Sequence, residues 1–137
     1  MILVDSCVII DVLENDPTWA DWSLRQLESV AVKHPLAINA VIYAEISVGF
    51  NRIEQMDAML KRIQITVNDM PREALFLAGK AFQRYKARGG TRTSALPDFF
   101  IGAHAAVLGI PLLTRDARRY ADYFPTLELL VPGKELG

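Results

Sequence analysis

The sequence predicts an α/β sandwich built on a mostly parallel sheet of four or five strands. Short, strongly apolar runs alternate with segments whose apolar residues recur at helical spacing, as in parallel α/β proteins. The chain has 137 residues, of which 51% are hydrophobic, so it can bury one sizeable core. No repeat, low-complexity tract or interdomain linker interrupts it. Residues 1–137 are therefore expected to form a single domain.

The first predicted elements are a strand buried on both faces at Ile2–Val4 and a short helix over residues 7–13. The next helix is expected to begin at Thr18, with Thr18 as N-cap and Asp21 as its capping-box partner. The basic and proline-containing residues 33–35 end this helix, since proline cannot continue it.

The middle of the chain repeats the same alternation. A second strand over Leu36–Ile38 leads into a helix with Asn39 as N-cap, which ends near Gly49. A further helix over 53–60 and a third strand over 63–67 follow. Strands separated by helices favour parallel pairing, because such a crossover brings the chain back to the starting edge of the sheet.

The last part of the chain begins with a long helix from Pro71 to about Lys86, followed by a loop over residues 88–94. Pro97 suits the first turn of the next helix, which Gly109 ends. The remaining predicted elements are a fourth strand, a short helix and a last strand, at residues 110–114, 116–121 and 127–131.

The net charge of −1 hides an uneven distribution along the chain. Residues 1–79 carry a net charge of −5, residues 80–119 carry +6, and residues 120–137 carry −2. A basic segment can attract phosphate groups, although a solvated basic face is the simpler alternative. The charge distribution therefore allows a nucleic-acid partner without requiring one.

The sequence also constrains the compartment. The single cysteine, Cys7, excludes an intramolecular disulfide and favours a reducing environment. Asp5 and Asp11 interrupt the apolar N-terminal stretch, which lacks the basic region and cleavage site of a signal peptide. No apolar run approaches the length of a membrane span. We expect a soluble cytoplasmic protein.

Four carboxylates stand beside or within strongly apolar runs, namely Asp5, Glu45, Asp98 and Asp116. Burying a lone carboxylate is costly, so such groups are usually paired, neutralised or bound to metal. Asp5 and Asp116 follow predicted strands, Glu45 lies on the helix after the second strand, and Asp98 lies in a first helical turn. Because parallel strands present their carboxyl ends at one edge of a sheet, we expect the four to converge there.

A cluster of carboxylates without histidine or cysteine offers only oxygen ligands. Such a site suits Mg²⁺ or Mn²⁺, whereas zinc prefers nitrogen or sulfur. A bound divalent cation can activate water and neutralise a scissile phosphate. Each acid also has a structural interpretation when taken alone: Asp98 as a partner of the helix dipole, Asp116 as an N-cap, Asp5 as an exposed strand end. Glu45 is harder to explain structurally, because its helical neighbours are apolar.

The motifs V-D-S-C-V-I-I, A-E on the third helix, L-P-D-F-F-I-G-A-H-A and L-L-T-R-D occur in this order over about residues 1–131. This set resembles PIN-domain proteins of the VapC toxin type. The resemblance implies a three-layer α/β/α sandwich with a central parallel sheet. It also implies an endoribonuclease that depends on Mg²⁺ or Mn²⁺, a homodimer, and a cognate antitoxin encoded alongside.

Carried over residue by residue, the resemblance places the family's catalytic and metal-binding acids at Asp5, Glu45, Asp98 and Asp116. It implies that Asp5 and Asp98 hold the metal most directly. Glu45 and Asp116 would complete the cluster and orient water or a second ion.

The same motifs imply supporting positions around the acids. Ser6 and Thr114 match hydroxyl positions that often support the carboxylates. Cys7 departs from the asparagine or serine common at its position, and it is interpreted as a small buried residue rather than a nucleophile. His104 follows Asp98 by six residues, so it does not share its helix face and is expected to be structural.

Basic residues flank the last two motifs. Lys80, Arg84 and Arg88 are spaced by four and Arg92 follows in the loop, so they could bind an RNA backbone or form the polar side of an amphipathic helix. Three arginines lie beside Asp116 and could contact phosphate or help to hold the acids apart electrostatically: Arg115, Arg118 and Arg119. Several methionine, leucine and phenylalanine side chains are expected in the core, and some could line a groove for an antitoxin helix: Phe50, Met56, Met59, Leu60, Phe76 and Phe82.

Two alternative functions remain open from the sequence. One is a related nuclease that acts on DNA or processes structured RNA. The other is a non-catalytic PIN-like module that binds nucleic acid or a protein partner. The presence of all four acids favours an enzyme.

Overall fold

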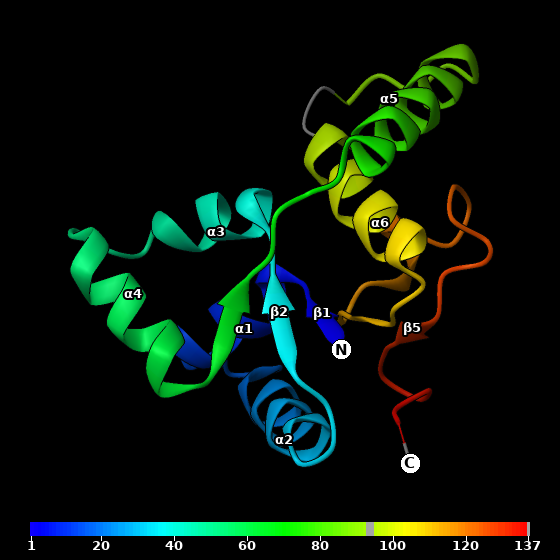
Figure 1. The fold of residues 1–137 in the computed structure, drawn as a ribbon. Coiled ribbons are helices and arrows are strands. Elements are labelled where there is room, and N and C mark those ends of the chain that lie inside the picture. Colours follow the sequence, from blue (N-terminus) through cyan, green and yellow to red (C-terminus); the bar gives the residue numbers. More distant parts are fainter. Residues whose placement is uncertain (93–94, 137) are drawn as a thin grey trace.

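A five-stranded, entirely parallel sheet with helices around it forms the framework of the computed structural model, which describes residues 1–92 and 95–136 (Figure 1). The strands are β1 (Ile2–Val4), β2 (Leu36–Ile38), β3 (Ile65–Val67), β4 (Leu112–Leu113) and β5 (Leu129–Leu130). The helices are α1 (Ser6–Leu13), α2 (Ala20–Ala31), α3 (Ala40–Ser47), α4 (Ile53–Arg62), α5 (Arg72–Ala87) and α6 (Leu96–Leu108), with a 3₁₀ helix η2 (Ala117–Arg119). The predicted α/β/α sandwich is confirmed.

The strand order, β3-β2-β1-β4-β5, places β1 at the centre of the sheet. In register, Ile2 of β1 faces Leu36 of β2, and Val4 of β1 faces Leu113 of β4. The chain moves outward from β1 to β3 and then crosses back to β4, so the direction of winding changes between β1 and β4. In open parallel sheets, sites form beyond the carboxyl ends of the strands at such a switch point.

The three central strands are buried on both faces. Leu3, Ala37 and Leu112 each have no exposed surface. Strands covered by helices on both sides read as continuous apolar runs rather than as alternating patterns, which is why β1 could be predicted from three residues. By contrast, Thr66 and Val67 on the edge strand β3 are exposed.

The ends of two helices agree with the sequence. The Asn39 side chain accepts a hydrogen bond from the N–H of Ile42 over 2.9 Å, so Asn39 caps α3 as predicted. Gly109 ends α6 in the left-handed region with φ of 65°, a conformation that glycine adopts without steric cost.

The predicted start of α2 is wrong. Thr18 does not cap this helix; the N-cap position is Trp19, one residue later, and it provides no side-chain hydrogen bond. Instead, the Asp16 carboxylate accepts the N–H groups of Thr18 over 2.9 Å and Trp19 over 2.8 Å. An ionised acceptor makes the stronger hydrogen bond, so Asp16 fixes this turn and the proposed capping box with Asp21 does not form.

Several boundaries differ by a few residues. The strand predicted over 63–67 begins at Ile65, because Gln64 adopts a left-handed conformation with φ of 59°. The predicted strands over 110–114 and 127–131 are shorter, and the helix predicted over 116–121 is the 3₁₀ turn η2. In the loop predicted over 88–94, residues 93 and 94 lie outside the described residues. Phe76, one of the side chains expected in the core or along a partner groove, is not in the core, since 69% of its surface is exposed.

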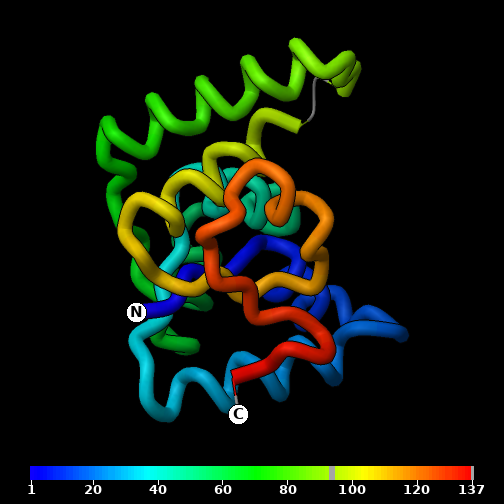
Figure 2. The backbone as a smooth tube through the Cα atoms, turned by 90° about the vertical axis from the view of Figure 1, so that its right-hand side faces the viewer, coloured from blue at the N-terminus to red at the C-terminus, as the bar shows by residue number. Residues whose placement is uncertain are grey.

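Helices α5 and α6 pack against each other as a pair, and Figure 2 shows the long tube of α5 running across α6. Helix α6 also contacts α3. Among the described residues, none of the helices has the length and apolar character needed to cross a membrane.

Candidate active site

Asp5 follows β1 directly and is almost completely buried, with 1% of its surface exposed. It is the N-cap of α1, and its Oδ1 accepts the N–H of Ser6 over 2.8 Å. Its Oδ2 accepts the hydroxyl of Thr114 over 2.8 Å and the hydroxyl of Tyr120 over 2.7 Å. Two donors use the acceptor capacity of Oδ2, which leaves Oδ1 as the atom with a free lone pair. Asp5 is therefore not the exposed strand end that its position also allowed.

Thr114 reaches Asp5 because β4 pairs with β1. The N–H of Asp5 donates to the carbonyl of Leu113 over 2.9 Å, which brings the residue after β4 beside the residue after β1. The Thr114 hydroxyl also accepts the N–H of Asp116 over 3.2 Å. One hydroxyl thus links two of the acids, in agreement with the supporting role expected of Thr114.

Glu45 joins the site from α3. The Ser6 hydroxyl donates to its Oε1 over 3.0 Å. Burial raises the pKa of Glu45, and the negative charge of Asp5 raises it further, while the Ser6 hydrogen bond and Arg119 act in the opposite direction. Glu45 therefore lies close enough to Asp5 for their charges to repel.

Asp98 lies in the first turn of α6, as predicted, with 15% of its side chain exposed. Burial raises its pKa to about 6, against the lowering effect of Arg119. The charges of Asp5 and Glu45 raise it as well. Asp5 after β1, Glu45 on α3 and Asp98 on α6 therefore share one electrostatic environment with an excess of negative charge.

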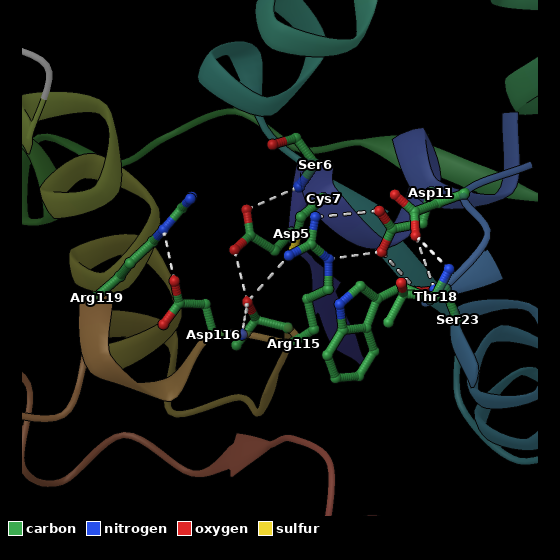
Figure 3. A network of polar contacts seen from close by, with 12 residues as sticks. Asp5, Ser6, Cys7, Asp11, Thr18, Ser23, Arg115, Asp116 and Arg119 are labelled. Carbon is green, nitrogen blue, oxygen red and sulfur yellow. Dashed lines mark hydrogen bonds and ion pairs between the residues drawn. The ribbon is translucent and has the colours of Figure 1, made fainter. Parts of the chain in front are cut away.

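Asp116 is linked to Asp98 by the guanidinium group of Arg119. It caps η2 by accepting the N–H of Arg118 over 3.1 Å, as one interpretation of the sequence expected. Its Oδ2 also accepts from Nε of Arg119 over 3.1 Å, and Nη1 of Arg119 lies 3.7 Å from Oδ1 of Asp98. Figure 3 shows Asp116 and Arg119 on one side of Asp5.

The four predicted acids therefore gather at one edge of the sheet, but not at coordination distance. Within residues 1–92 and 95–136, no three histidine, cysteine or acidic side chains are arranged so that they could hold a metal ion. The chemistry of the donors nevertheless fits a hard cation, because the groups around Asp5 present carboxylate and hydroxyl oxygens. The pKa values of Glu45 and Asp98 are raised mainly by burial and further by the neighbouring acids, so a bound cation would favour their ionised forms.

His104 has the structural role expected of it, whereas Cys7 is only partly buried. Burial raises the pKa of the Cys7 thiol to about 11, so the thiol stays protonated and is a poor nucleophile. His104 has no exposed surface, and its Nδ1 lies 3.1 Å from the Asn39 side-chain amide. Because Oδ1 of Asn39 already accepts from Ile42, its amide nitrogen is the donor to the histidine. The pair joins α3 to α6, which carry Glu45 and Asp98.

Two features were missed by the sequence analysis. Tyr120 is completely buried and donates to Asp5, yet nothing distinguishes it in the sequence from an ordinary core aromatic residue. Asp11 is also buried, and Arg115 binds both of its oxygens over 2.7 and 3.2 Å. The guanidinium group of Arg115 is therefore paired with Asp11, as Figure 3 shows. Asp11 could have been noticed by the criterion applied to Glu45, since its neighbours on α1 are apolar.

The fold and the acidic edge at the switch point together define a protein of the PIN type. The PIN domain family matches residues 2–123, and the chain belongs to this family. Comparison with curated proteins gives no match. The predicted family is confirmed, and it is a nuclease family.

Solved structures with a similar fold include toxin–antitoxin complexes. VapBC-1 from nontypeable Haemophilus influenzae gives a TM-score of 0.72 at 19% identity, covering 98% of this chain and 100% of that chain. VapBC2 from Rickettsia felis, bound to a DNA fragment from its promoter, gives 0.71 at 21% identity, covering 94% and 97%. A toxin–antitoxin complex from Klebsiella pneumoniae gives 0.70 at 21% identity, covering 99% and 100%. At these identities the similarity establishes the fold.

Proposed function

We propose that this protein is a metal-dependent endoribonuclease that acts as the toxin of a toxin–antitoxin pair. The observation that carries the proposal is the meeting of Asp5, Glu45, Asp98 and Asp116 at the switch point of a PIN-type sheet. When bound, Mg²⁺ or Mn²⁺ would lower the pKa of water and offset charge on the scissile phosphate. We place this activity in the cytoplasm, a reducing compartment in which the single cysteine would stay a free thiol.

The proposed roles of the acids follow from their surroundings. Asp5 is held rigidly by three donors and keeps one lone pair on Oδ1, so it would be the fixed metal ligand. Asp98 would be the second direct ligand, since its carboxylate lies at the same edge as Asp5 and Glu45, whose charges act on it. Glu45 and Asp116 would complete the site and orient the attacking water. Both are partly accessible, as contact with water requires.

The basic side of α5 would bind the RNA backbone. Lys80 and Arg84 are exposed on this helix, and Arg88 is exposed at its C-cap. Nζ of Lys80 lies 5.2 Å from the ring centroid of Phe76, which is itself largely exposed. Cations beside accessible aromatic rings are a common arrangement for binding single-stranded nucleic acid without sequence preference. We propose that this helix supports RNA binding rather than cleavage.

A cognate antitoxin and a homodimer are proposed from the family resemblance. The similar structures named above are toxin–antitoxin complexes, which supports the antitoxin. An apolar groove of about 300 Å³ between α1, α2 and α4 could receive a partner helix. It is lined in part by Ile9, Leu13, Leu24, Leu27, Met59 and Ile63. Met59 is one of the residues for which the sequence suggested this role.

Matched oligonucleotides distinguish this function from its rivals. Purified protein is incubated with a single-stranded RNA, with DNA of the same sequence, and with a structured RNA. Each reaction contains Mg²⁺, Mn²⁺ or a chelator. We expect cation-dependent internal cleavage of RNA alone. Preferential cleavage of DNA or of structured RNA would favour the nuclease alternative, and binding without cleavage under every condition would favour the non-catalytic module. A small antitoxin reading frame beside the gene would support the toxin assignment.

A further inference from the structure

Arg119 already places a positive charge among the acids. Its guanidinium group bridges Asp116, at 3.1 Å from Nε, and Asp98, at 3.7 Å from Nη1. These two carboxylates come from η2 and from α6. Arg119 therefore lies between two of the groups that are proposed to surround the metal (Figure 3 shows its contact with Asp116).

The neighbouring arginines do not share this role. Arg115 is paired with the buried Asp11, and for Arg118 the described contacts include only its backbone N–H. Burial acts to lower the pKa of Arg119, but the charges of Asp98, Asp5 and Asp116 outweigh it, so the pKa is raised. The acids thus stabilise the charged guanidinium in the position where it lies.

The bridge is also weak enough to be exchanged. About 40% of the Arg119 side chain and 36% of the Asp116 side chain are exposed, and the contact with Asp98 is long. Ion pairs of this exposure contribute little, because water screens the two charges. A divalent cation has twice the charge and a compact oxygen shell, so it interacts more strongly with the same carboxylates.

We propose that Arg119 is an internal counterion that competes with the divalent cation for the position between Asp98 and Asp116 and is displaced when the cation binds. This inference rests on the proposed metal-dependent function. In the absence of the cation, the guanidinium bridges Asp98 and Asp116 and limits their mutual repulsion. Arg119 therefore lowers the affinity of the site for the metal and raises the metal concentration that is needed to fill it.

Calorimetric titration with Mn²⁺ tests the competition without relying on catalysis. The proteins are the wild type, Arg119→Gln and the matched control Arg118→Gln, which removes the same charge one residue away. The titration is done at about pH 8, so that Asp98, with its pKa of about 6, is ionised in all three. We expect Arg119→Gln to bind Mn²⁺ about fivefold more tightly than wild type. Arg118→Gln should change the affinity by less than about twofold, because its charge is screened.

Equal affinities of the two variants would overturn the competition while leaving the metal site intact. Absence of Mn²⁺ binding to the wild type would overturn the proposed function, and the inference with it. If Arg119→Gln does not fold, the wild type still provides a test through NMR of its arginine side chains. Addition of Mg²⁺ should shift the Nε–H resonance of Arg119, assigned from its loss in Arg119→Lys, and should leave that of Arg115 in place. An Arg119 resonance unmoved by saturating Mg²⁺ would also overturn the inference.

Discussion

Tyr120 and Asp5, which are 115 residues apart in the sequence, are joined by a buried hydrogen bond in which the phenol donates to Oδ2 over 2.7 Å. Burial raises the pKa of Tyr120, and the charge of Asp5 raises it further, so the phenol remains a donor at any physiological pH. The bond orients a carboxylate at the centre of the acidic edge. Tyr120, which contacts neither metal nor substrate in the proposed mechanism, thus orients Asp5, which would bind the metal.

Tyr120→Phe is therefore expected to weaken both folding and activity. Removing the donor leaves a buried carboxylate with one partner fewer, which should cost about 2 kcal/mol of unfolding free energy. Loss of such an orienting contact should lower metal-dependent activity about tenfold. Denaturant unfolding and RNA cleavage are measured in parallel. Tyr123→Phe is the control, since no hydrogen bond from its hydroxyl is present among the described residues; equal effects of the two changes would contradict the role of Tyr120.

Asn39 and Tyr120 show how far the sequence could predict the site. The cap at Asn39 depends on residues three apart, and strands such as β1 are marked by continuous apolar runs, so local patterns were sufficient. The acids could be associated because the carboxyl ends of parallel strands share one edge. The contact between Tyr120 and Asp5 depends on how the chain at η2 returns toward β1. The pairing of Arg115 with Asp11 depends on the conformation of a long side chain. Neither leaves a local pattern in the sequence.

Replacing glycine with alanine is expected to have opposite effects on stability at Gly102 and at Gly79. A Cβ at Gly102 in α6 would lie 2.5 Å from the Phe124 ring and 3.1 Å from the Tyr120 ring, whereas at Gly79 in α5 it would meet nothing within 4 Å. Gly102→Ala should lower the unfolding free energy by about 2 kcal/mol through overpacking. Gly79→Ala should raise it by about 0.5–1 kcal/mol through helix propensity. Urea unfolding of the two variants decides this, and stabilisation of Gly102→Ala would show that the packing beside Tyr120 is loose.

Arg115 and Asp11 form an ion pair, called the clamp here, that joins α1 to the segment after β4. Replacing Arg115 with glutamine should lower the unfolding free energy by about 3 kcal/mol, because it leaves a buried carboxylate without its cation. Asp11→Ala combined with Arg115→Gln should cost less than the sum of the single changes, since no unpaired charge then remains. Denaturation of the three variants and of Arg25→Gln, an exposed control, provides the measurement. Additive effects would argue against the clamp.

Asp98 predicts a specific dependence of stability on pH. Its pKa is raised from 3.8 to about 6 in the folded protein, so the folded state holds this proton more tightly than the unfolded state. Between about pH 4 and pH 6 the unfolded chain loses the proton first, and the stability of the wild type should therefore fall as pH rises through this window. Asp98→Asn removes the contribution and should give a flatter profile there. Urea midpoints in metal-free buffer are compared, and parallel profiles for the two proteins would contradict the environment assigned to Asp98.

Cleavage of a labelled RNA by Asp98→Asn is the most direct test of the central claim, that the gathered carboxylates are a metal-dependent ribonuclease site. Wild type and variant are compared in Mg²⁺ and in Mn²⁺, with circular dichroism and urea unfolding to establish that both are folded. The exposed Asp122, changed to asparagine, is the matched control. We predict that Asp98→Asn loses at least about 100-fold in cleavage rate while Asp122→Asn retains the wild-type rate. Undiminished cleavage by a well-folded Asp98→Asn protein would contradict the assignment of this site.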